Sequence, residues 1–292
     1  MASMSRLRRS LALAQSRVNT RWRRSTKAFR DRRRPRLAAP PATGVESEKH
    51  GHGVFEIRLV GGDRRNVLGR STIDRIEQLV DEPPVGTKVI VITAAPPDFC
   101  AGYDLVEASR GGAEDLIAHE INFATLRRSL VPIVAAVQGN VIGGGLELAL
   151  SADIRVASPE TKFAIPAGTL GLVYSEAGIR LVVDAVGESV ARALFLGGRD
   201  LSAESALSMG LVTEIVGREQ LRERALDLAH SIASSSDVAN SGNRQILDAV
   251  VGRISVDTAE LRLGSFAPDG DLSQSIARFV ARRRQASKGL VE

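Results

Sequence analysis

Three consecutive glycines followed by a single acid form the part of this sequence best suited to chemistry. Gly143, Gly144 and Gly145 come after the apolar run IVAAV and lead into LELALSA, a helix-like stretch that carries Glu147 near its start. The first N–H groups of a helix have no acceptor within the helix, and they lie at the positive end of its dipole. Such a site can hold an anion, either a bound phosphate or an oxyanion that develops during a reaction.

The spacing of the glycines argues against phosphate. A dinucleotide-binding loop needs Gly-x-Gly-x-x-Gly and a P-loop ends in Gly-Lys-Ser/Thr, whereas this loop ends in Gly-Leu-Glu. The carboxylate of Glu147 would also repel a phosphate. We therefore predict an oxyanion site, which needs a second N–H donor from elsewhere. The stretch DFCAGYDL, residues 98–105, is the natural source, because it follows a strand and Gly102 permits a tight turn.

The elements around these two stretches alternate between strand and helix. VFEIRLV (54–60), KVIVITAA (88–95) and IVAAV (133–137) have the patterns of strands, as do IRVAS and KFAI after the glycines. STIDRIEQLVDE (71–82), with Ser71 as its N-cap, and EDLIAHEINFATLRRSL (114–130) have helical patterns. From about residue 175 the sequence is helical apart from TEIV. We predict an α/β fold in which a parallel sheet is covered by helices and followed by a helical C-terminal region.

Charge is distributed unevenly along the chain. Residues 1–44 hold thirteen Lys and Arg residues and one acid, whereas the remainder holds 26 basic and 33 acidic residues. This leader suits an organelle transit peptide, a basic arm that touches nucleic acid or anionic surfaces, or an upstream stretch included by a mis-set start. We expect a mitochondrial matrix location if it is a transit peptide and a cytoplasmic one if the protein is bacterial. Nucleic acid binding is expected only through the leader.

Composition disfavours several other classes of protein. No apolar run approaches the roughly 18–20 residues that cross a bilayer, so we expect no membrane span. Cys100 is the single cysteine, which excludes an intramolecular disulfide. We also expect no metal site, because the four histidines do not have the spacing of metal ligands. They are His50, His52, His119 and His230.

The two candidate stretches belong to a longer series of motifs. FCAGYDLVE, VQGNVIGGGLELALSADIRVAS, KFAIPAGTLGL, GRDLSAESALSMGLVTEIV and ARFVARRR follow one another between about residues 52 and 286. Together they resemble the crotonase superfamily, that of enoyl-CoA hydratases and isomerases. The resemblance implies a spiral of ββα units over residues 49–210 and a helical trimerisation region over 211–292. The basic leader, which we assign to residues 1–48, lies outside the resemblance. It also implies a homotrimer or a dimer of trimers.

The resemblance further assigns roles to individual residues. Members of the superfamily bind an acyl-CoA substrate, use no additional cofactor, and polarise its thioester carbonyl with two backbone N–H groups, here those of Tyr103 and Gly144. Glu147 matches a catalytic acid/base. The basic group that reaches the CoA of a neighbouring subunit matches Arg282. Other contacts to the CoA portion are implied for Arg65, Val67, Ala101, Tyr103, Asp104, Leu105 and Gly144.

One departure from the superfamily pattern leaves the reaction open. Its hydratases hold water between two glutamates, and the place of the second, just after a proline, is taken here by Ala167. Enoyl-CoA hydration or isomerisation with Glu147 alone is one alternative. A second is decarboxylation of a malonyl- or methylmalonyl-type CoA ester, because LGLVYS places Tyr174 as a tyrosine is placed in methylmalonyl-CoA decarboxylase. A non-catalytic fold that binds acyl-CoA, or RNA through the leader, is the third.

Overall fold

The computed structural model describes residues 43–107, 123–265 and 271–288, with side chains left out of the description at 264–265 and 281–288. Residues 1–42 of the leader, His119 and residues 114–122 of the helix predicted over 114–130 therefore lie outside the described residues. The helices, in chain order, are α2 (Arg70–Asp81), α4 (Ala124–Arg128), α5 (Gly144–Leu150), α6 (Ala167–Leu170), α7 (Glu176–Gly197), α8 (Ala203–Ser208), α9 (Leu221–Ala233), α10 (Asp237–Val250), α11 (Thr258–Ser265) and α12 (Asp271–Lys288).

Two sheets organise the fold, in the order β1-β2-β3-β4-β6-β9 and β5-β7-β8. In the larger sheet all neighbours are parallel except β1 and β2. The short step from β4 to β5 carries the chain from one sheet to the other. The strands are β1 (Gly44–Lys49), β2 (Val54–Val60), β3 (Val89–Ala94), β4 (Ile133–Val137), β5 (Asn140–Ile142), β6 (Ile154–Ala157), β7 (Lys162–Ala164), β8 (Leu201–Ser202) and β9 (Glu214–Ile215).

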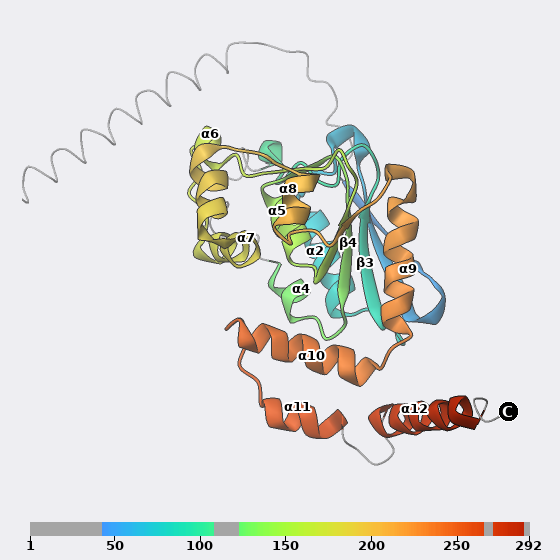
Figure 1. Ribbon diagram of the computed structural model, residues 1–292. Helices are drawn as coiled ribbons and strands as arrows, with labels where there is room; N and C mark the ends of the chain where they lie inside the picture. The colour runs from blue at the N-terminus through green and yellow to red at the C-terminus, as the bar shows by residue number, and fades with distance from the viewer. Residues whose placement is uncertain (1–42, 108–122, 266–270, 289–292) are drawn as a thin grey trace, which may run out of the picture. The chain divides into compact units, whose positions relative to one another are not determined.

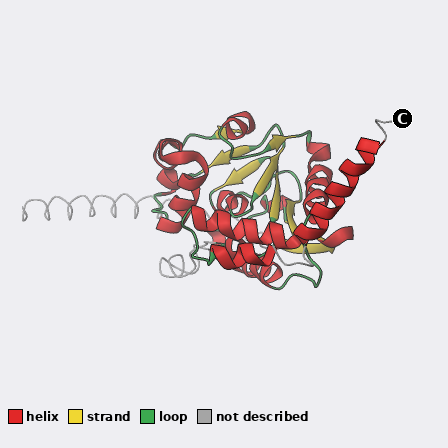
Figure 2. Cartoon of the chain, turned by 60° about the horizontal axis from the view of Figure 1, so that its bottom comes forward, coloured by secondary structure: helices red, strands yellow, loops and turns green. Residues whose placement is uncertain are grey.

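The period-two alternation of the strands divides the core between the two faces of the larger sheet. On β3, Val89 and Val91 pack toward α9, whereas Ile90 and Ile92 belong to the larger core that includes residues of α2, α5 and α7. Figure 1 shows α9 on one face of the strands with α2 and α5 on the other, and Figure 2 shows helices around the strands. The predicted α/β fold with a parallel sheet covered by helices is confirmed.

The structure differs from the sequence prediction at several segment ends. Residues 44–48, assigned to the leader, form most of β1, which pairs with β2. Residues 211–233, assigned to the C-terminal region, contain β9 of the larger sheet and α9, which covers that sheet. The predicted cap at Ser71 is wrong. Helix α2 begins at Arg70 with Gly69 as its N-cap, so Ser71 lies within the first turn.

Helices α10 to α12 follow this core. Helix α10 is joined to it by ion pairs between Arg244 and Asp153 at 3.0 Å and between Lys88 and Asp237 at 3.0 Å. Among the described residues, no helix combines the length and the apolar character that crossing a membrane requires. Trimerisation through this region stays a prediction, in keeping with its exposed apolar side chains: Val238, Leu247, Val250, Leu263, Ile276 and Phe279.

Candidate active site

The two stretches singled out in the sequence meet through backbone contacts. Cys100 forms a parallel bridge with Val141 of β5. In this bridge the Cys100 N–H donates to the Asn140 carbonyl at 3.1 Å, and the Ile142 N–H donates to the Cys100 carbonyl at 3.0 Å. Helix α5 then packs directly on Cys100, because a Cβ on Gly145 would lie only 2.5 Å from the Cys100 carbonyl oxygen. Glycine at 145 is therefore required by this close approach.

This packing brings Gly102, the residue before Tyr103, to the start of α5. Gly102 has a φ of +95°, and a Cβ placed on it would lie 2.8 Å from the Ile142 carbonyl oxygen and 3.8 Å from the Gly144 nitrogen. Gly144 is the first residue of α5, so its N–H has no acceptor within the helix. Tyr103 follows Gly102 directly. The backbone that leads into Tyr103 therefore lies close to the N–H of Gly144.

Glu147 and Tyr174 both approach Gly178, and Tyr174 also approaches Gly143. Glu147 is in the first turn of α5 and only 7% exposed, and its Oε2 lies 3.3 Å from where a Cβ on Gly178 would be. The ring of Tyr174 approaches the same position, with Cδ1 at 3.4 Å. At its other end, the Tyr174 hydroxyl lies 3.0 Å from where a Cβ on Gly143 would be. Tyr174 therefore extends from beside Glu147 to the glycine loop.

The surroundings of Tyr174 keep its phenol neutral. Burial raises the pKa of Tyr174, and the negative charge of Glu147 raises it further. Its ring packs edge-on against Phe195, with ring centroids 5.1 Å apart. Ala167, where a second glutamate is expected in hydratases, begins α6 and is buried in the same apolar core. The candidate site consequently combines one carboxylate and one protonated phenol, and residue 167 offers no second carboxylate.

The residues predicted to contact the CoA portion surround Tyr103, with one exception. The segment after β2 runs beside the turn, since the Ala101 N–H donates to the Arg65 carbonyl at 2.9 Å and the Asp104 N–H donates to the Leu68 carbonyl at 3.0 Å. The exception is Arg282, which lies in α12 with its side chain outside the described part. The positions that the structure gathers here are Arg65, Val67, Ala101, Asp104 and Leu105.

Asp104 has an evident structural role in this turn. Its buried carboxylate accepts from the N–H groups of Val106 and Glu107 at 3.0 and 3.2 Å and from the guanidinium of Arg64. Burial by itself raises the pKa of Asp104, but these hydrogen bonds and the charge of Arg64 outweigh burial and lower it. Asp104 therefore fixes the backbone that carries Tyr103.

Asp98 is a second residue that fixes the backbone of this turn, and the sequence analysis missed it. Its Oδ1 accepts from the backbone N–H and the side-chain amide of Asn140 at 2.7 and 2.6 Å. Its Oδ2 accepts from Nε of Arg65 at 2.5 Å. One buried carboxylate thus joins the turn to β5 and to the segment after β2. The available sequence signal was an acid at the very start of DFCAGYDL, beside a strand end.

The sequence model of the enoyl-CoA hydratase/isomerase family matches residues 50–286. The chain belongs to this family. The mitochondrial enoyl-CoA hydratase domain-containing protein 3 of Rattus norvegicus is 36% identical over 214 residues, which cover 68% of this chain and 70% of that protein. The carnitinyl-CoA dehydratase of Proteus mirabilis is 33% identical over 173 residues, 58% of this chain, and the match spans 66% of the dehydratase.

Solved structures of the family share the fold. The enoyl-CoA hydratase of Mycobacterium tuberculosis superposes with a TM-score of 0.61 and 30% identity, over 75% of this chain and 94% of that one. The enoyl-CoA hydratase of Bacillus anthracis superposes with a TM-score of 0.69 and 25% identity, over 82% of this chain and 96% of that one. These likenesses confirm the predicted crotonase fold.

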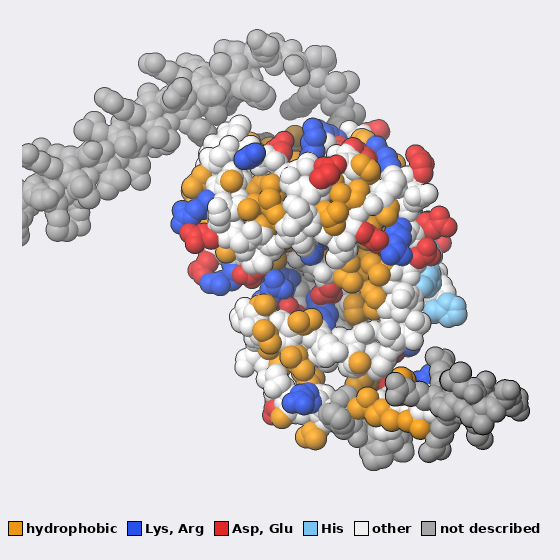
Figure 3. Space-filling model, in the orientation of Figure 1, with side chains coloured by type: hydrophobic (Ala, Val, Ile, Leu, Met, Phe, Trp, Pro, Cys, Tyr) orange, Lys and Arg blue, Asp and Glu red, His pale blue; other side chains and the backbone are white. Residues whose placement is uncertain are grey.

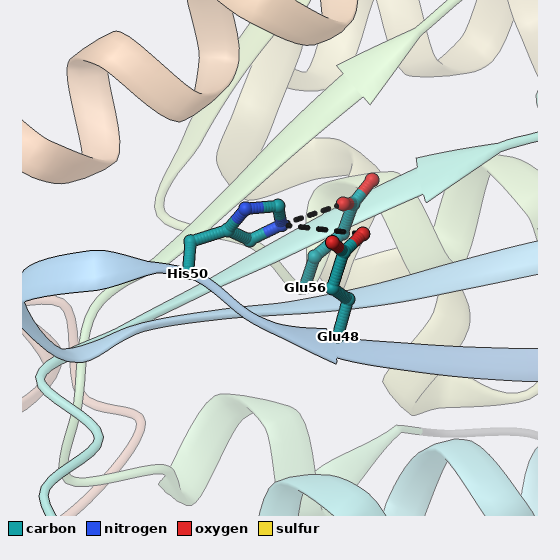
Figure 4. A group of neighbouring side chains, drawn as sticks. All are labelled: Glu48, His50 and Glu56. Carbon is teal, nitrogen blue, oxygen red and sulfur yellow. Dashed lines mark hydrogen bonds and ion pairs between the residues drawn. The ribbon is translucent and has the colours of Figure 1, made fainter.

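One further charged cluster lies where β1 and β2 meet α9. Figure 4 shows Glu48, His50 and Glu56 directed toward one another, and His50 Nε2 lies 2.9 Å from Glu56 Oε2 and 3.8 Å from Glu48 Oε2. Such a group can ligate a metal ion. Here, however, Arg222 donates to both oxygens of Glu56, at 2.8 and 2.5 Å, and Thr93 donates at 2.6 Å. A metal cation would have to displace the guanidinium, so these residues form an ion-pair cluster.

Proposed function

We propose that this enoyl-CoA hydratase/isomerase family member acts on an acyl-CoA through a thioester enolate. The N–H groups of Tyr103 and Gly144 hold the thioester oxygen, and Glu147 moves the proton. The observation that carries the proposal is the meeting of these two backbones beside one buried carboxylate. Fixed donors aimed at a developing oxyanion are strong catalytic elements, because loss of one costs about 2.7–4 kcal/mol of transition-state stabilisation.

A single carboxylate favours a shift of the double bond over addition of water. Glu147 takes a proton from one carbon of the enoyl chain, and the electron pair of the C–H bond moves into the thioester, whose oxygen faces the two N–H groups. The protonated Glu147 then returns the proton to another carbon, so no second acid is needed. Hydration needs a held water molecule, and Ala167 supplies no acceptor for it.

Tyr174 supports decarboxylation as a second candidate. The bond between the α-carbon and the carboxylate breaks, its electron pair forms the enolate in the same oxyanion site, and carbon dioxide leaves. A proton donor then completes the product. The neutral Tyr174 phenol, placed between Glu147 and the glycine loop, can donate a hydrogen bond to the substrate carboxylate. Both candidates use the same enolate and differ in the bond that breaks.

A mixture of 2-enoyl-, 3-enoyl- and malonyl-type CoA esters tests the proposal. Mass and NMR spectra separate a shifted double bond, gain of water and loss of carbon dioxide. We expect a shifted double bond, slowed about 10²–10⁴-fold by Glu147→Gln and unaffected by the matched change Glu176→Gln at an acid 90% exposed on α7. Carbon dioxide release that Tyr174→Phe abolishes would favour the second candidate. Binding of the esters with no change in any of them would indicate a non-catalytic fold.

The cellular location is a separate proposal. We infer that residues 1–44 act as a transit peptide, which their basic, acid-poor composition and the mitochondrial name of the rat relative support. A fluorescent protein fused behind these residues should enter mitochondria in a eukaryotic cell, and should stay in the cytoplasm when their arginines are changed to glutamine. Cytoplasmic fluorescence from both fusions would contradict this role.

A further inference from the structure

The carboxylate of Asp98 takes the place of a backbone group between two parallel segments. The turn that carries Cys100 runs parallel to β5, which it meets at Val141. A regular parallel ladder in this register would direct the Asn140 N–H to the Asp98 carbonyl oxygen. That N–H donates instead to Asp98 Oδ1 at 2.7 Å, and the carbonyl oxygen accepts from the side-chain amide of Asn66, also at 2.7 Å. The side chain of Asp98 therefore completes the ladder in place of its own carbonyl group.

This carboxylate is charged although it is buried. Figure 3 shows acidic side chains spread over one face of the molecule, where water solvates them, whereas Asp98 is only 3% exposed. A buried charge is tolerated where hydrogen bonds replace water. Burial by itself raises the pKa of Asp98, but the hydrogen bonds from Arg65 and from the two N–H donors of Asn140 outweigh burial and lower it. The ionised carboxylate therefore holds β5 against the turn.

The ladder continues from Asp98 toward the proposed oxyanion site. The Cys100 N–H donates to the Asn140 carbonyl at 3.1 Å, and the Ile142 N–H donates to the Cys100 carbonyl at 3.0 Å. Beyond these bonds, a Cβ on Gly102 would lie only 2.8 Å from the Ile142 carbonyl oxygen. The two segments thus stay in contact up to the residue before the first proposed N–H donor.

The register between these segments determines how the two proposed donors lie relative to one another. Tyr103 is three residues beyond Cys100, and Gly144 is three residues beyond Val141, the bridge partner of Cys100. A shift of the register by one residue would move one donor past the other by about 3.3 Å. Two hydrogen bonds to one oxygen do not survive such a shift, and even a misplacement of about 1 Å can cost about 10²-fold in rate.

We propose that Asp98 is a positioning residue of the oxyanion site. Its carboxylate fixes the register between the turn and β5, and this register sets the separation of the Tyr103 and Gly144 N–H groups. Asp98 acts through the backbone and takes no part in the proton transfer assigned to Glu147. The inference rests on the proposed function in that these two N–H groups hold the thioester oxygen.

The ¹³C NMR signal of bound butyryl-CoA, labelled at its thioester carbonyl, measures this positioning. Donors aimed at the thioester oxygen polarise the carbonyl group, so the signal should move downfield when the ester binds to the unmodified protein. Asp98→Ala removes every acceptor of the side chain and should return the signal toward its position in buffer. Asp98→Asn keeps one acceptor oxygen and should have an intermediate effect, which carries the test if the alanine variant does not fold.

Two further measurements separate positioning from binding and from stability. Exchange of the α-proton of butyryl-CoA with D₂O should slow about 10²-fold in Asp98→Ala, while the Kd of the ester changes little. Amide hydrogen exchange at Ile142, whose N–H donates across the ladder, should become faster in both Asp98 variants without any ester present. This second measurement reports the register itself and does not depend on the proposed function.

Glu56→Gln is the matched control. Glu56 is also a buried carboxylate that several donors hold, but its partner Arg222 lies on α9. The control should lower the free energy of unfolding and leave the carbonyl signal, the α-proton exchange and the Ile142 exchange unchanged.

The outcomes distinguish the positioning role from the proposed function. A carbonyl signal that both Asp98 variants leave in place, an equal change in Glu56→Gln, or unchanged exchange at Ile142 would overturn the positioning role and leave the proposed function intact. If the carbonyl signal of butyryl-CoA bound to the unmodified protein does not move downfield, both the proposed function and the positioning role are wrong.

Discussion

The carboxylate of Glu147 and the ring of Tyr174 both approach Gly178. Their nearest atoms lie 3.3 and 3.4 Å from the point where a Cβ on that glycine would stand. Glu147 comes from α5 and Tyr174 from the turn before α7, so this glycine sets the distance between two elements that carry the proposed chemistry. The site therefore depends on a residue that has no functional group of its own.

Substitution of Gly178 should reduce activity while preserving the fold. Alanine favours a helix over glycine by about 1 kcal/mol, which offsets the cost of crowding. The added methyl group nevertheless presses on Glu147 Oε2 and Ser175 Oγ, each 3.3 Å from its position, and touches the Tyr174 ring. We therefore expect Gly178→Ala to lower kcat with little change in Tm. Gly197→Ala in the same helix is the control, because nothing lies within 4 Å of its Cβ position. Equal kcat values for the two variants would show that the spacing over Gly178 is unimportant.

The phenol of Tyr174 should ionise at a higher pH than an ordinary tyrosine. Its pKa is raised by burial and by Glu147, whereas the unfolded chain titrates near about 10. The folded state therefore binds this proton more tightly, and its stabilising effect is complete below about pH 10 and is lost as the pH rises beyond it. An ultraviolet titration should contain a late phenolate transition that Tyr174→Phe removes. An identical titration of the variant above pH 10 would contradict the burial of this phenol.

Restoring a second carboxylate should restore hydration. Ala167→Glu places an acid where the family's hydratases carry one, and water gain by a 2-enoyl-CoA should increase relative to the unmodified protein. The change also introduces a charge where Ala167 is 5% exposed, so the free energy of unfolding should fall. Ala167→Gln has nearly the same shape without the charge and should not gain hydration. An equal rate for the Glu and Gln variants would assign any change to shape alone.

The cluster around Glu56 should make stability depend on pH. Burial raises the pKa of Glu56, but hydrogen bonds from Arg222, Thr93 and His50 outweigh burial and leave it below 4.5. The stabilisation is therefore present above about pH 4.5 and is lost as the pH falls toward the folded-state pKa. Glu56→Gln should lower the free energy of unfolding by about 1.5–3 kcal/mol at pH 7 and reduce its acid dependence. The exposed Glu46, changed to Gln, should alter neither quantity in urea unfolding experiments.

The fold and the location of the candidate site were predictable where they follow from a residue type at a fixed spacing. The run of glycines before Glu147 excluded a phosphate loop, and the apolar runs such as β3 indicated buried parallel strands. The edge strand β1 was not recognised, because its charged residues GVESEK resemble a solvated leader and its partner lies beyond a turn. A local pattern cannot report a pairing that another strand supplies.

The supporting residues were hidden for a similar reason. Asp98 acts through Asn140 and Arg65, which lie 42 and 33 residues away, so its role exists only after the two sheets have formed. Nothing in the sequence indicated a role for Gly178, because its neighbours in space come from separate elements.

Deuterium exchange at the α-carbon of butyryl-CoA tests the central claim most directly. An enolate formed in the oxyanion site and reprotonated by Glu147 exchanges the α-proton with D₂O whichever overall reaction the enzyme performs. We predict exchange that Glu147→Gln slows about 10²–10⁴-fold. We also predict that Gly144→Pro, which removes one N–H donor, abolishes it while Gly144→Ala retains it. Exchange no faster than in buffer, or an unchanged rate in both Glu147→Gln and Gly144→Pro, would contradict the account.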